Sequence, residues 1–339
     1  MRLGKYRVLL LNAGSRNSLI KQFIRSFGER AEILVSDSFE LAPALYENCP
    51  SFLIPNWKSE NYLNEVLKLC ENENVDAIIS LLDPDLSVLS KNKELFEASG
   101  IVPIISSYEL VELCFDKLSL AKSLGEHGLE TVPSFGTVEE YISSDIPYPK
   151  FPAMVKPRRG SGSAGLNIIH SETELFNFFN REDEPNEWMI QPFLKICEFG
   201  ADMYFNLSGG LVDYFVKQKL KMRAGETDKS IAVKNQKIFE LLDRLASIYD
   251  FRGPIDVDLF IYGDEVMISE INPRFGGGYL HSYEAGVRFP DYILENLGSK
   301  ALPRYEVHYK EGSVLMKYFA YSFVEDNEQL VSNEIDIKK

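Results

Sequence analysis

Apolar and polar positions in the first third of the chain follow two alternating periods. Short apolar runs of the strand type are separated by stretches with helical spacing, and the runs end in polar or glycine-containing turns. The expected strands are R-V-L-L-L-N (7–12), A-E-I-L-V-S-D (31–37), D-A-I-I-S-L-L-D (76–83) and I-V-P-I-I (101–105). The expected helices are 61–70, 93–100 and one that follows A-G-S-R-N-S after the first strand. This alternation predicts a parallel α/β sheet, so we expect residues 1–106 to form one Rossmann-like domain.

The turn after the first strand contains a single glycine, Gly14. A dinucleotide-binding turn needs the fuller pattern G-x-G-x-x-G between a strand and a helix. An NAD-dependent oxidoreductase is therefore a weak alternative for this domain.

Beyond residue 106 the rhythm of the chain changes. Ser106 and Glu109 have the spacing of a capping box, which predicts a helix start, and a second helix is expected from Asp116 to about Gly125. The further expected elements are a strand at 151–156, a loop at 157–165, a strand at 166–170, a capped helix at 171–179, an acidic linker at 181–187, and strands W-M-I-Q-P-F-L and A-D-M-Y-F-N-L. We expect a second unit over 107–187, a third over 188–325 and a polar tail at 326–339.

The loop P-R-R-G-S-G-S-A-G contains the glycine spacing G-x-G-x-x-G at Gly160, Gly162 and Gly165. Because a β-like segment follows it, the loop joins two strands and is not a Rossmann turn. A glycine hairpin of this kind can lie over nucleotide phosphates with its backbone N–H groups turned inward. Lys156, on the strand that enters the loop, could then contact a phosphate. A mobile surface hairpin is the alternative interpretation.

Two acid-bearing strands are expected at 254–262 and 265–273, joined around Gly263 and Asp264. Asp256 and Asp258 share a face of the first strand, and Glu270 and Asn272 share a face of the second. Asp258 can lie opposite Glu270 only if a three-residue loop or a bulge corrects the register. Oxygen ligands crowded in this way suit Mg²⁺. A polar strand pair facing solvent is the alternative.

The second strand runs into S-E-I-N-P-R-F-G-G-G, residues 269–278. Arg274 would stand where charge develops on a transferred phosphate, because its guanidinium is always charged and presents a rigid fork. The three glycines would let backbone N–H groups and substrate approach closely, since no side chain blocks them.

Composition narrows the classes of function. The 339 residues carry a net charge of −15, which argues against a nucleic-acid or anionic-membrane surface. The longest apolar runs are far shorter than the ~18 residues of a membrane span. The four cysteines form no C-x-x-C and the four histidines have no zinc-type spacing, so we expect a cytoplasmic protein in a reducing compartment.

The order of these motifs resembles the ATP-grasp superfamily. The residues that carry the resemblance are Lys117, Lys156, Gln191-Pro-Phe-Leu, Glu198, Asp258, Glu270 and Asn272. The nearest resemblance is to one half of the carbamoyl-phosphate synthetase large subunit and to its stand-alone relatives. It implies an α/β and α+β fold: a Rossmann-like pre-ATP-grasp domain, then an ATP-grasp small subdomain (107–187) and large subdomain (188–325).

The resemblance also implies a role for each site residue. ATP phosphates would be bound by Lys117, Lys156 and the loop residues Gly160, Ser161, Gly162 and Ser163. Adenine would meet Gln191, Pro192, Phe193 and Leu194, and the ribose would meet Glu198. Asp258, Glu270 and Asn272 would hold Mg²⁺, two ions by analogy, with Mn²⁺ as a substitute. Arg274 would steady the transferred phosphate, and Arg223 is the candidate from the substrate segment 219–229.

This chain departs from the synthetase pattern at three positions. Lys117 and Lys156 stand where synthetase halves usually carry Arg, and Asp258 stands where they carry Gln. Many ATP-grasp enzymes with Lys and Asp at these positions join a carboxylate to an amine, so we expect a carboxylate–amine ligase with small-molecule substrates, possible as a homodimer. The alternatives are phosphorylation of bicarbonate or carbamate, and a nucleotide-binding regulatory module without turnover.

The substrates themselves are not predicted by the sequence. Candidate contacts are the acids Asp83 and Asp85, which end a parallel strand where open α/β sheets place ligands. A solvated turn is the alternative for that pair. The loop 279–288 is a second candidate, and its His281 is expected to be a packing or surface residue more than a ligand contact.

Overall fold

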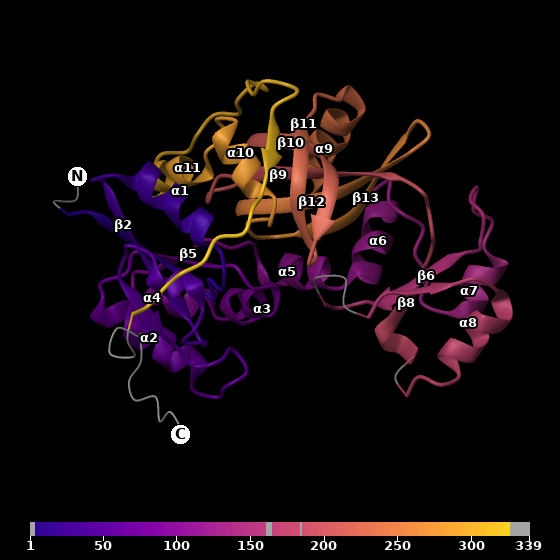
Figure 1. Cartoon of the computed structure of the whole chain (residues 1–339), viewed down its shortest axis with the longest axis horizontal. Helices are drawn as coiled ribbons and strands as arrows, with labels where there is room; N and C mark the ends of the chain where they lie inside the picture. Colours follow the sequence, from indigo (N-terminus) through magenta and orange to yellow (C-terminus); the bar gives the residue numbers. More distant parts are fainter. Residues whose placement is uncertain (1–3, 161–164, 184, 326–339) are drawn as a thin grey trace.

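Three β-sheets organise the chain, and the smallest of them lies in a lobe beside the other two (Figure 1). The computed structural model describes residues 4–160, 165–183 and 185–325. The first sheet is parallel and has five strands, the second has six antiparallel strands, and the third has three. The α/β and α+β fold class expected from the sequence is confirmed.

The N-terminal sheet has the strand order β3-β2-β1-β4-β5. Its strands are β1 (Tyr6–Leu11), β2 (Ala31–Asp37), β3 (Ser51–Leu53), β4 (Ala77–Ser80) and β5 (Val102–Pro103). Its helices are α1 (Asn17–Phe27), η1 (Pro43–Tyr46), α2 (Tyr62–Asn72), α3 (Asp83–Lys91) and α4 (Lys93–Ala98). The strand expected at 76–83 ends at Ser80, because Asp83 and Pro84 begin α3. Both residues suit the first turn of a helix.

Two helices lead out of this domain: α5 (Tyr108–Phe115) and α6 (Lys117–Glu126). The predicted capping residue of α5 was wrong by one position. Ser107 caps the helix by accepting the Leu110 N–H, while the Ser106 hydroxyl accepts the backbone N–H of Arg252, 3.0 Å away, and so is engaged elsewhere. The predicted start of α6 is confirmed, because the Asp116 carboxylate accepts the N–H groups of Leu118 and Ser119.

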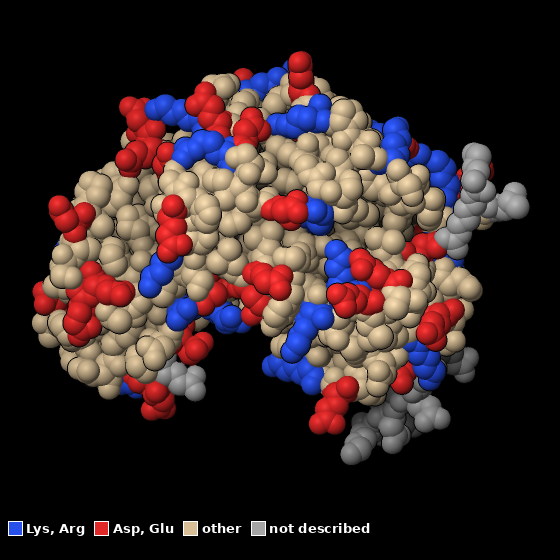
Figure 2. Space-filling view, turned by 180° about the vertical axis from the view of Figure 1, so that it is seen from behind, with Lys and Arg blue, Asp and Glu red and all other residues tan. Residues whose placement is uncertain are grey.

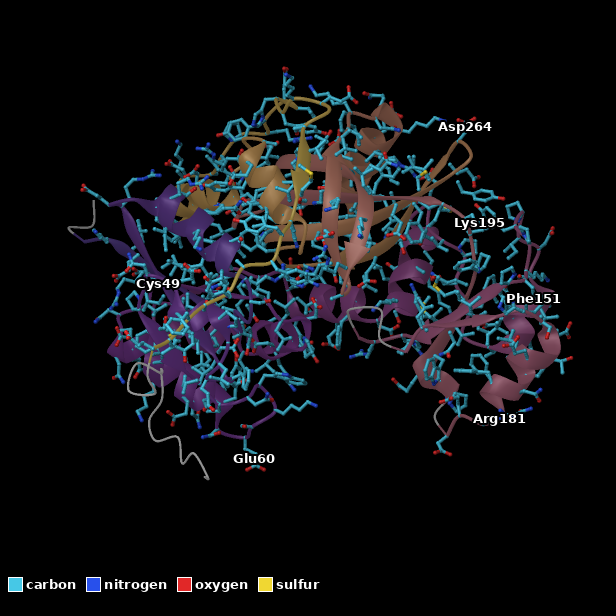
Figure 3. The ribbon with its side chains drawn as sticks, in the orientation of Figure 1. Cys49, Glu60, Phe151, Arg181, Lys195 and Asp264 are labelled. Carbon is cyan, nitrogen blue, oxygen red and sulfur yellow. The ribbon has the colours of Figure 1, made fainter. Side chains whose placement is uncertain are left out.

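The small sheet has the order β7-β6-β8 and lies at the right of Figure 1. It consists of β6 (Ala153–Pro157), β7 (Asn167–Ile169) and β8 (Trp188–Pro192), with α7 (Val138–Ser143), α8 (Glu172–Phe179) and η2 (Pro185–Glu187). Its core contains the buried side chains of Tyr141, Leu175 and Ile190. Figure 3 places Phe151 and Arg181 in this outlying lobe, apart from the other two sheets.

The large sheet has the order β13-β12-β9-β10-β11-β14. Its strands are β9 (Cys197–Phe205), β10 (Leu211–Arg223), β11 (Glu226–Ala232), β12 (Gly253–Tyr262), β13 (Glu265–Asn272) and β14 (Val314–Met316). Its helices are α9 (Gln236–Ile248), α10 (Tyr279–Glu284) and α11 (Phe289–Leu297). One apolar core joins α1 to α10 and α11, with the Phe23 and Phe275 rings in edge contact at 5.5 Å. The N-terminal domain is thus packed directly on the large sheet.

The hairpin of β12 and β13 has a two-residue turn at Gly263 and Asp264, because Tyr262 pairs with Glu265. The expected bulge is present: Asp258 pairs with Glu270, whereas Leu259 pairs with Ile268, so Ser269 is the extra residue. A bulge of one residue shifts the alternation of side chains and puts both acids on one face. Figure 3 places Asp264 at the exposed tip of this hairpin.

Among the described residues, no helix combines the length and apolar character that a membrane span requires. The longest of the helices given above is α9, with 13 residues.

His281 is buried in α10 and is a packing residue, as expected. Its Nδ1 lies 2.9 Å from the Ser230 hydroxyl and its Nε2 lies 3.0 Å from the Ser313 hydroxyl, and its ring packs on Phe215. Burial, with a smaller contribution from the Lys217 charge, lowers the pKa of His281 to about 4. The imidazole is therefore neutral in the folded protein at pH 5, where an unfolded chain would be protonated.

This pKa shift predicts a pH-dependent stability. Because the unfolded histidine binds a proton below pH ~6.5 and the folded one does not, the free energy of unfolding should fall as pH drops from 6.5 towards 4. We expect this single group to account for about 2 kcal/mol between pH 7 and pH 5. Urea denaturation of wild type and His281→Gln measures it. The variant should show the shallower pH dependence, and His170→Gln, at an exposed histidine, should match wild type.

Candidate active site

The acids of the β12–β13 hairpin face positively charged side chains from two other elements. The Lys219 ammonium, on β10, lies 2.5 Å from the Asp258 carboxylate. The Lys117 ammonium, at the first position of α6, lies 3.8 Å from Glu270. These lysines lie where a cation would be needed to hold the two carboxylates together.

The pKa values of the acids reflect their burial first and the nearby charges second. Burial, the negative charge of Asp258 and that of Asp202 raise the pKa of Asp256 to about 7. Burial also raises the pKa of Glu270, and although Lys117 and Lys156 oppose that effect, they do not cancel it. Burial is thus the main reason why Asp256 and Glu270 hold a proton more strongly than a free carboxyl group, and the charge of neighbouring acids adds to it.

Lys117 and Lys156 come together with the described end of the glycine loop. The Lys117 ammonium donates a hydrogen bond to the Gly160 carbonyl oxygen at 2.5 Å. Lys156, on β6, is close enough to Glu270, Lys117 and Asp258 for their charges to act on it, and burial lowers the pKa of its ammonium. Ser161, Gly162 and Ser163 lie outside the described residues.

A pocket opens between these groups and the N-terminal domain. Its polar wall is formed by Asp83, Lys117, Gly160, Glu270 and Asn272, and its apolar wall by Leu86, Val111, Cys114, Phe115, Ile271 and Pro273. Figure 2 shows the molecule hollowed between the lobe of the small sheet and the remainder, with Lys, Arg, Asp and Glu side chains gathered along the hollow. α3, α5, α6 and β13 thus meet at one place.

Arg274 is bound to the N-terminal domain by a bidentate ion pair. Its Nε lies 2.6 Å and its Nη2 lies 3.0 Å from the two carboxylate oxygens of Asp83, and Nη2 also donates to the Asn272 side-chain oxygen at 3.3 Å. Burial alone would lower the pKa of Arg274, but the charges of Asp83, Asp256 and Glu270 outweigh it, and the pKa lies above its usual value. The guanidinium is held beside the acids in a fixed orientation.

Asp85, the second acid of the pair at the start of α3, does not reach the β12–β13 acids through an ion pair with Arg274 as Asp83 does, but points into the N-terminal domain. Asp85 is fully buried, and its carboxylate accepts a hydrogen bond from the Asn12 amide at 2.8 Å. At the same end of the sheet, the Gly14 N–H donates to the Asp37 carboxylate at 2.7 Å. A side chain therefore already occupies the glycine N–H that a dinucleotide pyrophosphate would need.

The glycine run after Arg274 is packed against charged side chains. A Cβ atom on Gly276 would lie 2.5 Å from the Asp256 carboxyl carbon, one on Gly277 would lie 2.9 Å from Glu226, and one on Gly278 would lie 2.6 Å from the Lys217 side chain. Side chains at these positions would displace the charged groups. These three positions are glycine because the chain passes directly over the side chains of Asp256, Glu226 and Lys217, which leave no room for a Cβ atom.

Charged groups from three elements meet around Glu226 at the start of β11. Arg16, just before α1, lies 3.0 Å from it, and Lys317, just after β14, lies 2.9 Å from it. Arg223, on the same hairpin, instead lies 3.1 Å from Asp228, and its guanidinium stacks 4.5 Å from the Phe319 ring centroid. Within the segment 219–229, Lys219 is thus the side chain that pairs with an acid of the β12–β13 hairpin, whereas Arg223 pairs with Asp228.

The segment 191–194 joins the small sheet to the large one. Gln191 is buried, and its amide donates to the Ser134 hydroxyl at 2.8 Å, while the Phe193 N–H donates to the Pro152 carbonyl oxygen at 3.0 Å. Figure 3 places Lys195 on this connection, between the two lobes. Glu198 follows on β9, opposite Phe260, and its charge acts on Lys219.

The structure adds three residues that the sequence analysis did not select: Arg16, Lys219 and Glu226. A signal existed for Lys219, because Lys217 and Lys219 alternate on one strand and so share a face. No comparable signal pointed to Arg16, since its partner Glu226 lies 210 positions away in the chain.

The acids and the amide fit a hard divalent cation in their chemistry. Asp258 and Glu270 are direct cross-strand partners, and Asn272 follows two residues later on the same face. Within the described ranges, no group of three or more His, Cys, Asp or Glu side chains is arranged to hold a metal. A cation here would have two carboxylates and one amide oxygen, and would depend on water and phosphate oxygens for the rest, as Mg²⁺ commonly does.

Comparisons with known families match two parts of the chain. Residues 8–105 match the family model described as PylC-like, N-terminal domain. Residues 114–278 match the model described as ATP-grasp domain. The predicted resemblance is confirmed at this level, and its finer form, to carbamoyl-phosphate synthetase, stays a prediction.

Curated relatives and solved structures agree with these matches. The vancomycin B-type resistance protein VanB of Enterococcus faecalis is 23% identical over 76% of this chain and 82% of its own length. A formate-dependent phosphoribosylglycinamide formyltransferase of Burkholderia pseudomallei is 20% identical over 79% of this chain and 69% of its length. The N5-carboxyaminoimidazole synthetase of Staphylococcus aureus complexed with ADP has a TM-score of 0.70 at 19% identity, over 90% of this chain and 80% of that one.

A second similar structure is the biotin carboxylase domain of the Hydrogenobacter thermophilus 2-oxoglutarate carboxylase, in complex with MgADP, ADP and bicarbonate. Its TM-score is 0.73 at 16% identity, over 91% of this chain and 73% of that one. At such identities, the two structures support the fold of this chain and not its substrates.

The packing of the glycine run predicts the effect of one added methyl group. Gly276→Ala should displace Asp256, and we expect it to lower the free energy of unfolding by about 1–3 kcal/mol, as overpacking usually does. Gly125→Ala is the matched control, because a Cβ atom at Gly125 meets nothing within 4 Å and the residue lies in α6. The control should be neutral or stabilising. Equal urea midpoints for Gly276→Ala and wild type would contradict the packing described here.

Proposed function

We propose that this chain, which is an ATP-grasp protein by its domain at residues 114–278 and carries a PylC-like N-terminal domain, is an ATP-dependent ligase. It phosphorylates a carboxylate and couples the resulting acyl phosphate to an amine. The coarser activity, an ATP-grasp ligase, rests on the family match and on the similarity to the enzymes named above. The order of steps and the roles of residues are the proposal.

A single observation carries the proposal. The acids Asp258 and Glu270 lie opposite each other on adjacent strands, with Lys219 at 2.5 Å and Lys117 at 3.8 Å, and Arg274 is fixed at the edge of the same cluster. A solvent-facing polar strand pair would not need buried lysines on its acids. A site that binds phosphate groups and cations needs both signs of charge at close range.

ATP would lie between the small and large sheets. Lys117 and Lys156 would bind its phosphates, and the loop residues Gly160, Ser161, Gly162 and Ser163 would cover them. Gln191, Pro192, Phe193 and Leu194 would meet the adenine, and Glu198 the ribose. The support for this placement is that Lys156, on β6 of the small sheet, and Lys117 lie beside Glu270 of the large sheet, and that Lys117 donates to the Gly160 carbonyl oxygen.

Asp258, Glu270 and Asn272 would hold Mg²⁺, as two ions, with Mn²⁺ able to replace it. Bound metal would neutralise charge on the phosphates during transfer. Lys219 and Lys117 would then move from the acids towards the phosphate oxygens. This exchange of partners is consistent with two lysines already positioned on the carboxylates.

The chemistry that these residues support has two steps. A carboxylate oxygen of the substrate attacks the γ-phosphorus and ADP leaves, with Arg274 steadying the charge on the transferred group. The amine nitrogen then attacks the carbonyl carbon of the acyl phosphate, phosphate leaves, and the nitrogen loses a proton to give the amide. Catalysis is mostly positioning and electrostatic stabilisation. Arg223 would act from the edge, on the substrate side.

Phosphorylation of bicarbonate or carbamate is the second candidate. It rests on the order of motifs that resembles one half of the carbamoyl-phosphate synthetase large subunit. An assay of ADP formation that supplies either bicarbonate or an organic carboxylate separates the two, because only one of the acids should stimulate turnover.

Three further expectations complete the proposal. Both substrates would be small molecules, the protein would act without nucleic acid or membrane, and it would be cytoplasmic. The charged side chains of Arg16 and Glu226, at the junction of the N-terminal domain and the large sheet, favour substrates that carry charge in addition to the reacting groups.

Nucleotide choice is the first test of the proposal. We expect the protein to bind ATP in the presence of Mg²⁺ and not to bind NAD or NADP, because the Gly14 N–H is occupied by Asp37 and the lysines converge at the acids. Isothermal titration with each ligand, with and without EDTA, measures this. Tight NAD binding without ATP binding would contradict the proposal.

The second test removes one negative oxygen from the acid cluster. Glu270→Gln should lower the rate of ATP-dependent phosphate release by about 100-fold or more, because small displacements at a reacting centre reduce the rate by that much. The fold should survive, because relieving the crowding of acids does not destabilise a metal-free protein. Arg274→Lys should act in the same direction, because an ammonium cannot reproduce the bidentate contact with Asp83.

Glu265→Gln provides the matched control for this pair. Glu265 begins the same strand but is exposed and accepts a hydrogen bond from Tyr148, away from the acids. It should keep wild-type turnover and melting temperature. Wild-type rates in Glu270→Gln would leave the acid cluster as a structural feature only.

A further inference from the structure

The carboxylate of Glu226 is held by cations from two other parts of the chain. The Arg16 guanidinium lies 3.0 Å from its Oε1, and the Lys317 ammonium lies 2.9 Å from its Oε2. Arg16 precedes α1 of the N-terminal domain, and Lys317 follows β14 of the large sheet. Each carboxylate oxygen therefore has a cation of its own, which is the arrangement of a two-point receptor for a carboxylate.

The acid of this group is more exposed than its cations. The side chain of Glu226 is 41% exposed, whereas those of Arg16 and Lys317 are 23% and 21% exposed. Burial alone would raise the pKa of Glu226, but the charges of Arg16, Lys317 and Arg274 outweigh it, and the pKa lies below its usual value. Ion pairs at such exposure are individually weak. A carboxylate from solution can therefore compete with Glu226 for both cations.

The backbone around Glu226 is irregular. Arg223 pairs with Glu226 across a turn in which Ala224 and Gly225 have φ angles of 49° and 77°. The pairing of β10 with β11 also shifts twice, between Lys219 and Lys221 and again at the next residue. Such shifts interrupt the ladder of backbone hydrogen bonds. The end of this hairpin is thus held less firmly than a regular strand pair.

The start of α1 adds positive potential beside Arg16. Arg16 is the N-cap residue of this 11-residue helix, and the first turn contains no acid. Within the described part of the chain, no side chain accepts a hydrogen bond as a cap of α1. The N-terminus of a helix carries the equivalent of about half a positive charge. An anion bound to Arg16 is stabilised by this helix end as well as by the guanidinium.

The group lies close to the proposed reacting centre. A Cβ atom on Gly277 would lie 2.9 Å from the Glu226 carboxyl carbon, so the chain passes directly over this acid. Gly277 follows Arg274 by three positions, which is at most about 11 Å of extended chain. A small molecule with two charged ends can therefore meet Arg274 with one end and replace the Glu226 carboxylate with the other.

We propose that Arg16 and Lys317 form a binding site for a free carboxylate of a substrate, and that Glu226 occupies this site until the substrate displaces it. The carboxylate bound here is a second one, distinct from the carboxylate that is phosphorylated. Because one carboxylate replaces another, neither cation is left unpaired. The assignment of the ligand as a substrate rests on the function proposed above, whereas the carboxylate site itself does not.

Binding of succinate to the full chain without ATP tests the site. Succinate should raise the melting temperature of wild type more than sodium chloride does at the same ionic strength. In Glu226→Gln the half-saturating concentration of succinate should fall by about tenfold, because the competing internal carboxylate is gone. The matched control is Glu130→Gln, which removes the acid from another exposed ion pair, with Arg244 at 2.8 Å. This control should bind succinate as wild type does.

Two further variants remove the cations one at a time. Arg16→Gln and Lys317→Gln, each in the Glu226→Gln background, should raise the half-saturating concentration of succinate by about tenfold, since each removes one charge-assisted contact. The two changes lie in different elements, so misfolding of one variant leaves the other as a test. Succinate binding that survives both changes would place the carboxylate elsewhere.

Matched pairs of compounds identify the substrate that carries the second carboxylate. ADP formation with ATP and Mg²⁺ is compared for succinate against butyrate as the acid, and for β-alanine against propylamine as the amine. A preference for succinate assigns the carboxylate to the acid substrate, and a preference for β-alanine assigns it to the amine. In either case Arg16→Gln should remove the preference. Equal rates within both pairs would overturn the assignment to a substrate.

Three binding results would overturn the site. They are wild type that responds to succinate no more than to chloride, equal succinate binding by Glu226→Gln and Glu130→Gln, and tighter binding of inorganic phosphate than of succinate. Since these titrations contain no ATP, their failure would remove the carboxylate site alone. Failure of the nucleotide titration described above would remove the proposed function and leave the succinate result in force.

Discussion

Repulsion between carboxylates held at short range is the constraint on which this structure depends. Asp258 and Glu270 are paired across adjacent strands, and Asp256 follows on the same face with a pKa of about 7. Such an arrangement is unfavourable unless positive charge lies beside it. Lys219 and Lys117 supply that charge, each from a different element. The charges at this place are therefore balanced by side chains that different elements bring together.

Each of the three sheets contributes a different part of this balance. The large sheet supplies the acids, the small sheet supplies Lys156 beside the glycine loop, and the N-terminal domain supplies Asp83, which orients Arg274. The shared apolar core around Phe23 and Phe275 keeps the N-terminal domain in position for that ion pair. Since the parts come from separate units, the charge balance depends on how those units are packed.

Local patterns in the sequence were sufficient for the fold and for part of the site. Alternation placed the acids on one face and required a three-residue loop or a bulge, and the structure has the bulge, at Ser269. Short-range rules failed where a distant group competed: Ser106 did not cap α5, because the Arg252 N–H takes its hydroxyl. Arg16 was not selected and Asp83 was assigned only as a candidate substrate contact, because their ion-pair partners are fixed only when the N-terminal domain packs on the large sheet.

The ion pair between Arg274 and Asp83 limits how the domains of this protein can be exchanged. The arginine belongs to the glycine-containing segment after β13, whereas its partner begins α3 of the N-terminal domain. A chimera that received another N-terminal domain without an acid at this place would leave a buried guanidinium unpaired, at a cost of about 3–5 kcal/mol. Recombination between relatives should therefore succeed only where the donor domain brings a carboxylate to the same corner of its sheet.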